Sequence, residues 1–200
     1  MTQAVEPVPV DTAARRRALA TVGIMAFGRK DYDRAEQVQS RLVRECMEEG
    51  AEPTEIATAL YNLANTYIRQ KRAEEAVETL NRAIEGCLFH NVATMLPMLY
   101  CNLGVALHRA EETDMAFAAF KVARDYFRAQ KNIPSEAHVC DCLAGMYLEQ
   151  GKERKAEQTW LYALHLYDQI KNPNMQKVRE CGRAGIELKL KHFIGCRDAA

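Results

Sequence analysis

The residues best suited to bind a metal ion are one histidine and three cysteines. His138 and Cys142 are four positions apart, a spacing that places both side chains on one face of a helix. Imidazole and thiolate are the ligands that Zn²⁺ prefers, so the pair could form half of a zinc or redox site, with Cys101 and Cys181 as further candidates. Buried cysteines more commonly act as small hydrophobic residues. We therefore predict no metal site and no cofactor, with these four residues as minor candidates.

Motifs of nucleotide binding and catalysis do not stand out. The string GMYLEQGKE, which begins at Gly145, has one residue too many for a P-loop and has Glu153 where the hydroxyl residue belongs. No H-E-x-x-H or G-x-S-x-G sequence occurs. Paired carboxylates such as Glu111 and Glu112 suit the solvated start of a helix, where they interact favourably with its dipole. The prediction is a protein that is not an enzyme and has no catalytic residues.

Composition and charge describe a globular, helical protein. The chain has 200 residues, of which 48% are hydrophobic and 27% charged, with 10 glycines and 6 prolines. The 27 basic and 27 acidic residues give a formal net charge of zero. A binder of nucleic acid or of a membrane surface needs clustered positive charge, so neither partner is expected.

Cysteine usage and the N-terminal sequence predict a cytoplasmic protein. The 7 cysteines are an odd number at irregular spacing, which indicates reduced thiols and not a disulfide framework. The start of the chain, MTQAVEPVPVDTAARRR, lacks the apolar segment of a secretory signal. The most apolar stretch, residues 87–107, is interrupted by Pro97 and Asn102 among others, which favours burial in a core over membrane insertion.

An internal repeat of about 40 residues organises the chain. One column of small residues consists of Gly23, Ala64, Gly104 and Ala144. Twelve positions later, a second column consists of Ala35, Ala76, Ala116 and Ala156. Four positions further on, the last three repeats have the large residues Leu80, Phe120 and Trp160. Small residues let two antiparallel helices approach closely, and large ones fill the gap to the neighbouring repeat. A helical bundle has no reason to keep such a period.

These columns resemble the tetratricopeptide repeat. The fourth repeat carries the pattern most fully, with Leu143, Ala144, Tyr147, Gly151, Ala156, Trp160 and Ala163. The usual repeat of the family has about 34 residues, so longer helices or longer loops must absorb the difference, and the repeat length is similar to that of kinesin light chains. The first repeat has Gln39 in the large-residue column, which we interpret as a solvent-facing position of a terminal repeat.

The resemblance implies an all-α fold: a right-handed α-solenoid superhelix of four helix hairpins plus a C-terminal capping helix. The expected helices span residues 13–28, 31–48, 54–69, 73–88, 97–109, 113–130, 135–149 and 153–171, with the cap at 175–193. Residues 1–11 are expected to form a disordered leader and residues 195–200 a frayed tail. Between them, residues 12–194 form a single solenoid domain, with repeats at about 16–52, 57–93, 97–133 and 137–173.

In the family, the first helix of each hairpin lines a concave groove, and the matching positions can be carried over. The first repeat would contribute Ala20, Ile24 and Phe27. The peptide-binding positions of the later repeats would be Tyr61, Asn62, Asn65, Ile68, Arg69, Met98, Asn102, Val105, His108, Arg109, Asp141 and Leu148. A family variant that clamps the carboxylate tails of chaperones needs Lys and Asn in the first repeat. Ala20 and Ile24 stand there instead, so that specificity is not expected.

Three asparagines indicate how such a groove would hold its ligand. The side chains of Asn62, Asn65 and Asn102 each carry a donor and an acceptor, so they can bond a peptide backbone regardless of its sequence. The predicted function is a scaffold that binds a peptide segment of a partner protein in a preorganised groove. Two alternatives remain open: a regulator or sensor whose superhelix responds to a bound peptide, and self-association through the edge helices.

Overall fold

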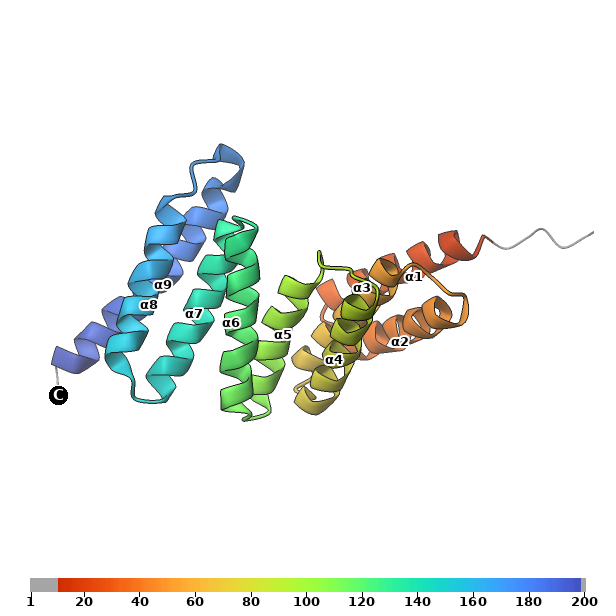
Figure 1. Ribbon diagram of the computed structural model, residues 1–200, viewed down its shortest axis with the longest axis horizontal. Helices are drawn as coiled ribbons and strands as arrows, with labels where there is room; N and C mark the ends of the chain where they lie inside the picture. The colour runs from red at the N-terminus through yellow and green to blue at the C-terminus, as the bar shows by residue number, and fades with distance from the viewer. Residues whose placement is uncertain (1–10, 199–200) are drawn as a thin grey trace, which may run out of the picture. The chain divides into compact units, whose positions relative to one another are not determined.

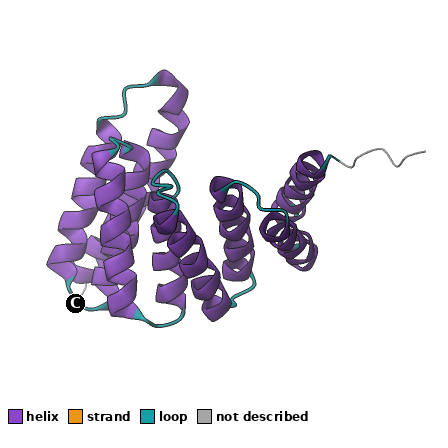
Figure 2. Cartoon of the chain, turned by 45° about the vertical axis from the view of Figure 1, so that its right-hand side comes forward, coloured by secondary structure: helices purple, strands orange, loops and turns teal. Residues whose placement is uncertain are grey.

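Helices and loops make up the whole described part of the chain. The structure is a computed structural model that describes the backbone of residues 11–198 and the side chains of residues 11–193. No β-strand occurs within residues 11–198 (Figure 2). The helices there are α1 (Thr12–Gly28), α2 (Tyr32–Glu48), α3 (Pro53–Arg69), α4 (Ala73–Phe89), α5 (Leu96–Arg109), α6 (Thr113–Ala129), α7 (Ile133–Glu149), α8 (Glu153–Asp168), a 3-10 helix (Pro173–Met175) and α9 (Gln176–Asp198).

The helices fall into two units, the first ending at Val92 and the second beginning at Ala93. In unit 1, α1 pairs with α2 and α3 with α4, and α2 packs on α3 (Figure 1). In unit 2, α5 pairs with α6 and α7 with α8, α6 packs on α7, and α9 packs on α8 and α7. The predicted all-α fold of four hairpins and a capping helix is thereby confirmed. The prediction of one continuous domain over residues 12–194 stays a prediction.

Longer helices, and not longer loops, account for the length of the repeat. Helices α1, α2, α3, α4, α6 and α7 have 17 residues each. The links within hairpins are as short as residues 29–31 and 70–72. Two boundaries differ from the sequence prediction by more than two residues. Helix α8 ends at Asp168, and Ile170 just beyond it is buried at 5% exposure, while α9 continues to Asp198. The predicted leader lies outside the described residues except for Asp11, and so do residues 199–200 of the predicted tail.

One kind of turn ends each of the helices from α1 to α7. The second residue after each helix has a positive φ, in a series formed by Lys30, Gly50, Lys71, Asn91, Glu111, Lys131 and Gly151. After Lys30, the Asp31 amide donates to the Ala26 carbonyl at 3.0 Å, and equivalent bonds follow the other members. This is the Schellman motif. Successive motifs are 20 or 21 residues apart, which is half the length of the 40-residue repeat.

Close contact between the small and large columns confirms the packing argument from the sequence. A Cβ added to Gly104 would lie 2.8 Å from the Phe120 ring, and one added to Gly23 would lie 2.9 Å from Cγ of Gln39. Gln39 is not solvent-facing as predicted. It is 3% exposed and accepts a hydrogen bond of 2.6 Å from the Thr66 hydroxyl. The prediction was wrong because a paired glutamine can fill a core position.

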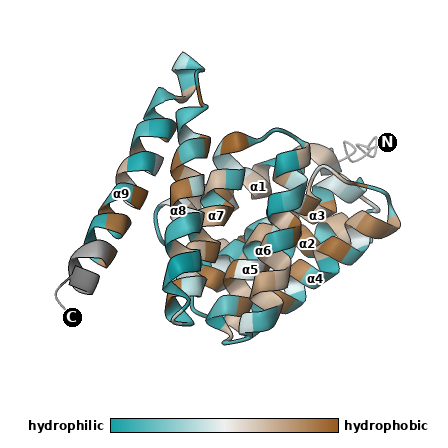
Figure 3. Ribbon diagram, turned by 60° about the vertical axis from the view of Figure 1, so that its left-hand side comes forward, coloured by the Kyte–Doolittle hydropathy of each residue, from teal (hydrophilic) through white to brown (hydrophobic). Residues whose placement is uncertain are grey.

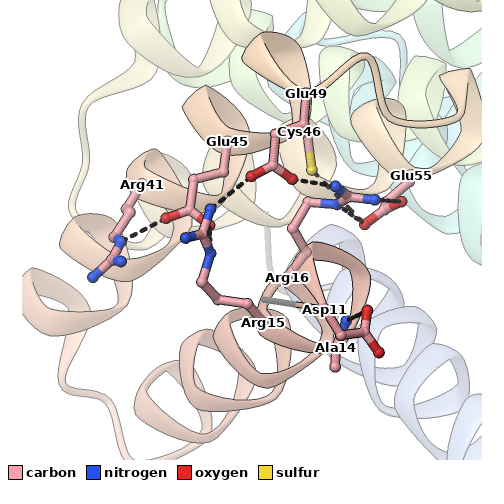
Figure 4. A network of polar contacts seen from close by, with 9 residues as sticks. All are labelled: Asp11, Ala14, Arg15, Arg16, Arg41, Glu45, Cys46, Glu49 and Glu55. Atoms are coloured by element: carbon pink, nitrogen blue, oxygen red, sulfur yellow. Dashed lines mark hydrogen bonds and ion pairs between the residues drawn. The ribbon is translucent and has the colours of Figure 1, made fainter. Parts of the chain in front are cut away.

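An ionic cluster fixes the start of α1 against α2 and α3 (Figure 4). The Arg16 side chain, from a residue only 8% exposed, donates to Glu55 at 2.8 Å and pairs with Glu49. Beside it, Arg15 pairs with Glu45 at 3.0 Å and with Glu49 at 2.6 Å. Because a buried charge is tolerated only when it is paired, these contacts hold α1 in one orientation.

Candidate functional site

Helices α1 and α3 of unit 1 border two neighbouring cavities. The larger, of about 440 Å³, is lined by Ala13, Arg16, Arg17, Ala20, Leu42, Glu52, Thr54, Glu55, Thr58, Ala59 and Asn62. The smaller, of about 100 Å³, is lined by Ile24, Phe27, Gln39, Asn62 and Asn65. Asn62 borders both, so the two cavities form one track along the helices. We call this surface the α1/α3 groove.

The α1/α3 groove changes character along its length. At the N-terminal end of α1, the Arg17 side chain is 71% exposed and lies 3.8 Å from the Asp11 carboxylate. Ile24, 56% exposed, gives the other cavity an apolar wall. Beyond it, Arg69 donates to the Tyr32 hydroxyl at 3.2 Å. The groove therefore offers a cation near one end, amides in the middle and apolar surface beside them.

The predicted site residues of unit 1 lie mostly on this side of α3. Asn62 and Asn65 are half-buried and line the cavities, Tyr61 is half-buried, and Arg69 is exposed. Ile68 is only 6% exposed and packs in the core, so it presents little surface to a ligand.

In unit 2, the predicted site residues His108 and Asp141 each contact a side chain of another helix. Nε2 of His108 on α5 lies 3.4 Å from the Glu149 carboxylate on α7. Nζ of Lys189 on α9 lies 2.6 Å from the Asp141 carboxylate on α7, which also accepts a bond of 2.9 Å from the Trp160 indole. Asp141 thus satisfies a buried indole N–H and ties α9 to α7. The sequence analysis missed this role because Asp141 and Lys189 are far apart in the chain.

The other predicted positions of unit 2 are more accessible. Met98 is 41% exposed and Leu148 37%. Asn102 and Val105 are half-buried, and Arg109 is exposed.

The cysteines and histidine proposed as minor metal candidates do not form a ligand cluster. Within the described side chains, no group of three or more His, Cys, Asp or Glu residues could hold a metal ion. Sγ of Cys142 lies 4.0 Å from Nε2 of His138. Burial, helped by the neighbouring Cys101 thiol, raises the pKa of Cys142 to about 12, and burial raises the pKa of Cys101 to about 11. Burial therefore disfavours the thiolate form, which is the form that ligates metals.

A third cavity in unit 1 falls outside every sequence prediction. Its volume is about 420 Å³, and it lies among α2, α3 and α4, with Met47, Ile56, Arg82 and Phe89 in its wall. The Phe89 side chain is 82% exposed. The only sequence signal for this cavity was the apolar Phe89 at the last position of α4.

No helix in residues 11–198 is both long enough and apolar enough to cross a bilayer. The predicted cytoplasmic location stays a prediction.

The arrangement of helix hairpins defines the chain as a helical-repeat protein, a class built for contacts with other proteins. Residues 14–88 match the tetratricopeptide repeat family. The resemblance that the sequence columns predicted is confirmed over these residues, and the family is typically a protein–protein interaction module. No curated protein is significantly similar in sequence.

Solved structures with low sequence identity share the fold over most of the chain. BtubC from P. vanneervenii has a TM-score of 0.72 at 14% identity, covering 96% of this chain and 84% of that one. A putative kinesin light chain from Podosopora anserina has a TM-score of 0.74 at 13% identity, covering 92% and 88%. MamA from Desulfovibrio magneticus RS-1 has a TM-score of 0.62 at 18% identity, covering 78% of each. The resemblance to kinesin light chain-like repeats is confirmed at the level of fold.

Proposed function

We propose that the protein is a non-catalytic scaffold that holds an extended peptide segment of a partner protein in the α1/α3 groove. The observation that carries the proposal is the position of Asn62, which borders both cavities beside Asn65 and the apolar Ile24 and Phe27. A ligand lying along this track would meet amide groups and apolar surface together.

The amide side chains supply the sequence-independent part of the binding. Each asparagine can accept from a peptide N–H and donate to a peptide carbonyl, and Asn62 and Asn65 lie one helical turn apart on α3. Ile24 and Phe27 would take an apolar side chain of the ligand, which gives selectivity. The ionic cluster around Arg16 holds α1 in place before the ligand arrives, so less ordering is needed on binding.

Residues of unit 2 have a secondary role in this proposal. Met98, Asn102, Val105, Arg109 and Leu148 are accessible enough to contact a longer partner. His108 and Asp141 are engaged with Glu149 and Lys189, so we assign these two residues to the stability of unit 2.

A peptide selected from a random phage-displayed library against the full-length protein would test the proposal. Its affinity is then measured by titration calorimetry for the wild type and for the Asn62→Ala/Asn65→Ala double variant. Loss of up to four hydrogen bonds is expected to weaken binding roughly 100-fold, equivalent to about 3 kcal/mol. Asn81→Ala, at an exposed position of α4, is the matched control and should bind like the wild type.

NMR with the same peptide localises the contact. Amide shifts concentrated in α1 and α3 are expected. A double variant that melts like the wild type and keeps full affinity would overturn the proposal, as would shifts confined to other helices.

A further inference from the structure

Helix α1 has an apolar face that points away from both its packing partners and the groove. Gly23 and Ala26 are buried, and Ile24 and Phe27 line the groove. A third face consists of Ala14, Ala18, Val22 and Met25, all exposed, with Val22 at 39% and Met25 at 51%. Their spacing of four, four and three residues places them on one stripe of the helix. We call this stripe the outer face of α1.

The repeat shows what such a face does elsewhere in unit 1. The positions of α3 equivalent to Ala18, Val22 and Met25, 41 residues later, are Ala59, Leu63 and Thr66, and all three are buried. The equivalent of Ala14 is Glu55, which is half-buried and pairs with Arg16. Thr66 bonds Gln39 of α2, the helix that precedes α3. The outer face of α1 thus has the composition of a surface that packs on another helix, but no described helix covers it.

The last helix, α9, differs at its own outward positions. In unit 2, α7 packs on α8 partly through Ala137, Cys140 and Ala144. One period later, α9 has Lys177, Glu180 and Ala184, all exposed. Figure 3 shows hydrophilic positions recurring along α9. These positions of α9 therefore carry two charged side chains, whereas the outer face of α1 carries none, although Leu188 on α9 is also 70% exposed.

We propose that a second copy of the chain docks on the outer face of α1, with the two α1 helices antiparallel and related by a two-fold axis near position 20. In that arrangement Ala18 of one copy opposes Val22 of the other, and Ala14 opposes Met25. Each small residue faces a large one, which is the self-complementarity that a two-fold interface requires.

Charge at the two ends of α1 agrees with the antiparallel orientation. The same two-fold axis brings Asp11 of one copy opposite Arg29 of the other. The Asp11 side chain is 66% exposed while it caps the helix by accepting from the Ala14 amide at 2.9 Å, and Arg29 is exposed at the other end. A parallel arrangement would oppose like charges, and antiparallel helix dipoles also attract.

The proposal goes beyond peptide binding and can fail separately from it. Val22 and Met25 lie on a different face of α1 from Ile24 and Phe27, so a substitution on the outer face leaves the groove lining intact. An interface formed by single helices falls below about 1,200 Å² and corresponds to a weak, concentration-dependent dimer.

Sedimentation velocity of the full chain over a concentration series tests the dimer. The wild type is expected to associate reversibly, and Met25→Glu should raise the dissociation constant at least tenfold because it buries an unpaired charge in each copy. Arg29→Glu should raise it severalfold by placing like charges opposite each other. Met115→Glu is the matched control, since Met115 on α6 is 56% exposed, close to Met25, and it should leave the association unchanged. A wild type that stays monomeric up to millimolar concentration, or a Met25→Glu variant that associates as well as the wild type, would overturn the proposal.

Photo-crosslinking tests the occupant and the orientation. Val22→benzoylphenylalanine, in a mixture of ¹⁴N- and ¹⁵N-labelled chains, should give crosslinks between copies to residues 14–22 of α1. Crosslinks within one chain to residues 1–10 would mean that the protein's own N-terminal segment covers the face. That result, or crosslinks between copies to any other helix, would overturn the proposal.

Discussion

The two units place similar polar residues at the inner side of their first helices but use them differently. In unit 1, Asn62 and Asn65 border cavities between α1 and α3. In unit 2, His108 contacts Glu149 and Lys189 contacts Asp141, so side chains of α5, α7 and α9 are tied to one another. The difference shows that a polar groove position of a repeat protein can serve a ligand or its neighbouring helix, and that position in the repeat does not decide which.

The largest expected effect is a difference in peptide affinity between asparagine variants of unit 1 and of unit 2. For the selected peptide described above, Asn62→Ala/Asn65→Ala should lose roughly 100-fold in affinity, whereas Asn102→Ala should lose less than about threefold. Titration calorimetry on the three proteins measures both numbers. An equal loss of affinity for Asn102→Ala would contradict the assignment of peptide binding to the asparagines of unit 1.

Thiol reactivity should show that Cys142 in unit 2 is less reactive than an exposed cysteine. A pKa of about 12 leaves few thiolates on Cys142 at pH 8, and after allowance for its higher intrinsic nucleophilicity its reaction should be roughly 50-fold slower than that of a free thiol. The exposed Cys181 should react first. Iodoacetamide labelling followed by peptide mass spectrometry gives the rates.

The rate for Cys142 should rise with pH up to about 12, because only the thiolate reacts. Labelling of Cys142 as fast as that of Cys181 at pH 8 would contradict the raised pKa of the Cys142 thiol.

Asp141 should matter for stability. Asp141→Ala leaves the Trp160 N–H, in a residue 3% exposed, without its partner, and should lower the free energy of unfolding by about 2 kcal/mol. Asp141→Asn keeps an acceptor for the indole and removes the charge that faces Lys189, so its loss should be under about 1 kcal/mol. Urea denaturation followed by circular dichroism measures both. Equal losses would assign the effect to the ion pair and not to the indole.

The smallest effect is expected where the two units are alike. Lys30 in unit 1 and Lys131 in unit 2 both have a positive φ in equivalent turns. Replacing either by glycine should raise the free energy of unfolding by about 1 kcal/mol, because glycine adopts this conformation without steric cost. Thermal denaturation of Lys30→Gly and Lys131→Gly provides the measurement. Asn91→Gly is a useful comparison, since asparagine already tolerates this region and should gain less.

Gln39 shows where the sequence argument reached its limit. Gln39 occupies the column of the repeat in which the other repeats have large buried residues. Because its side chain is polar, the sequence nevertheless predicted that it faces solvent. Only the tertiary structure reveals that Thr66, 27 positions away, supplies the hydrogen bond that makes its burial tolerable. The same holds for Arg16, whose partners Glu49 and Glu55 come from other parts of the chain.

The sequence by itself determined the resemblance to tetratricopeptide repeats, the four hairpins and nearly all helix boundaries to within two residues, because the repeat of small and large residues reports packing between helices that are close in sequence. It also placed Asn62 and Asn65 on the face of α3 that borders the groove. Only the tertiary structure shows which polar residues line cavities and which form ion pairs or hydrogen bonds with neighbouring helices. It also shows that the apolar outer face of α1 is exposed. Those properties depend on contacts between residues far apart in the chain, for which the repeat pattern carries no signal.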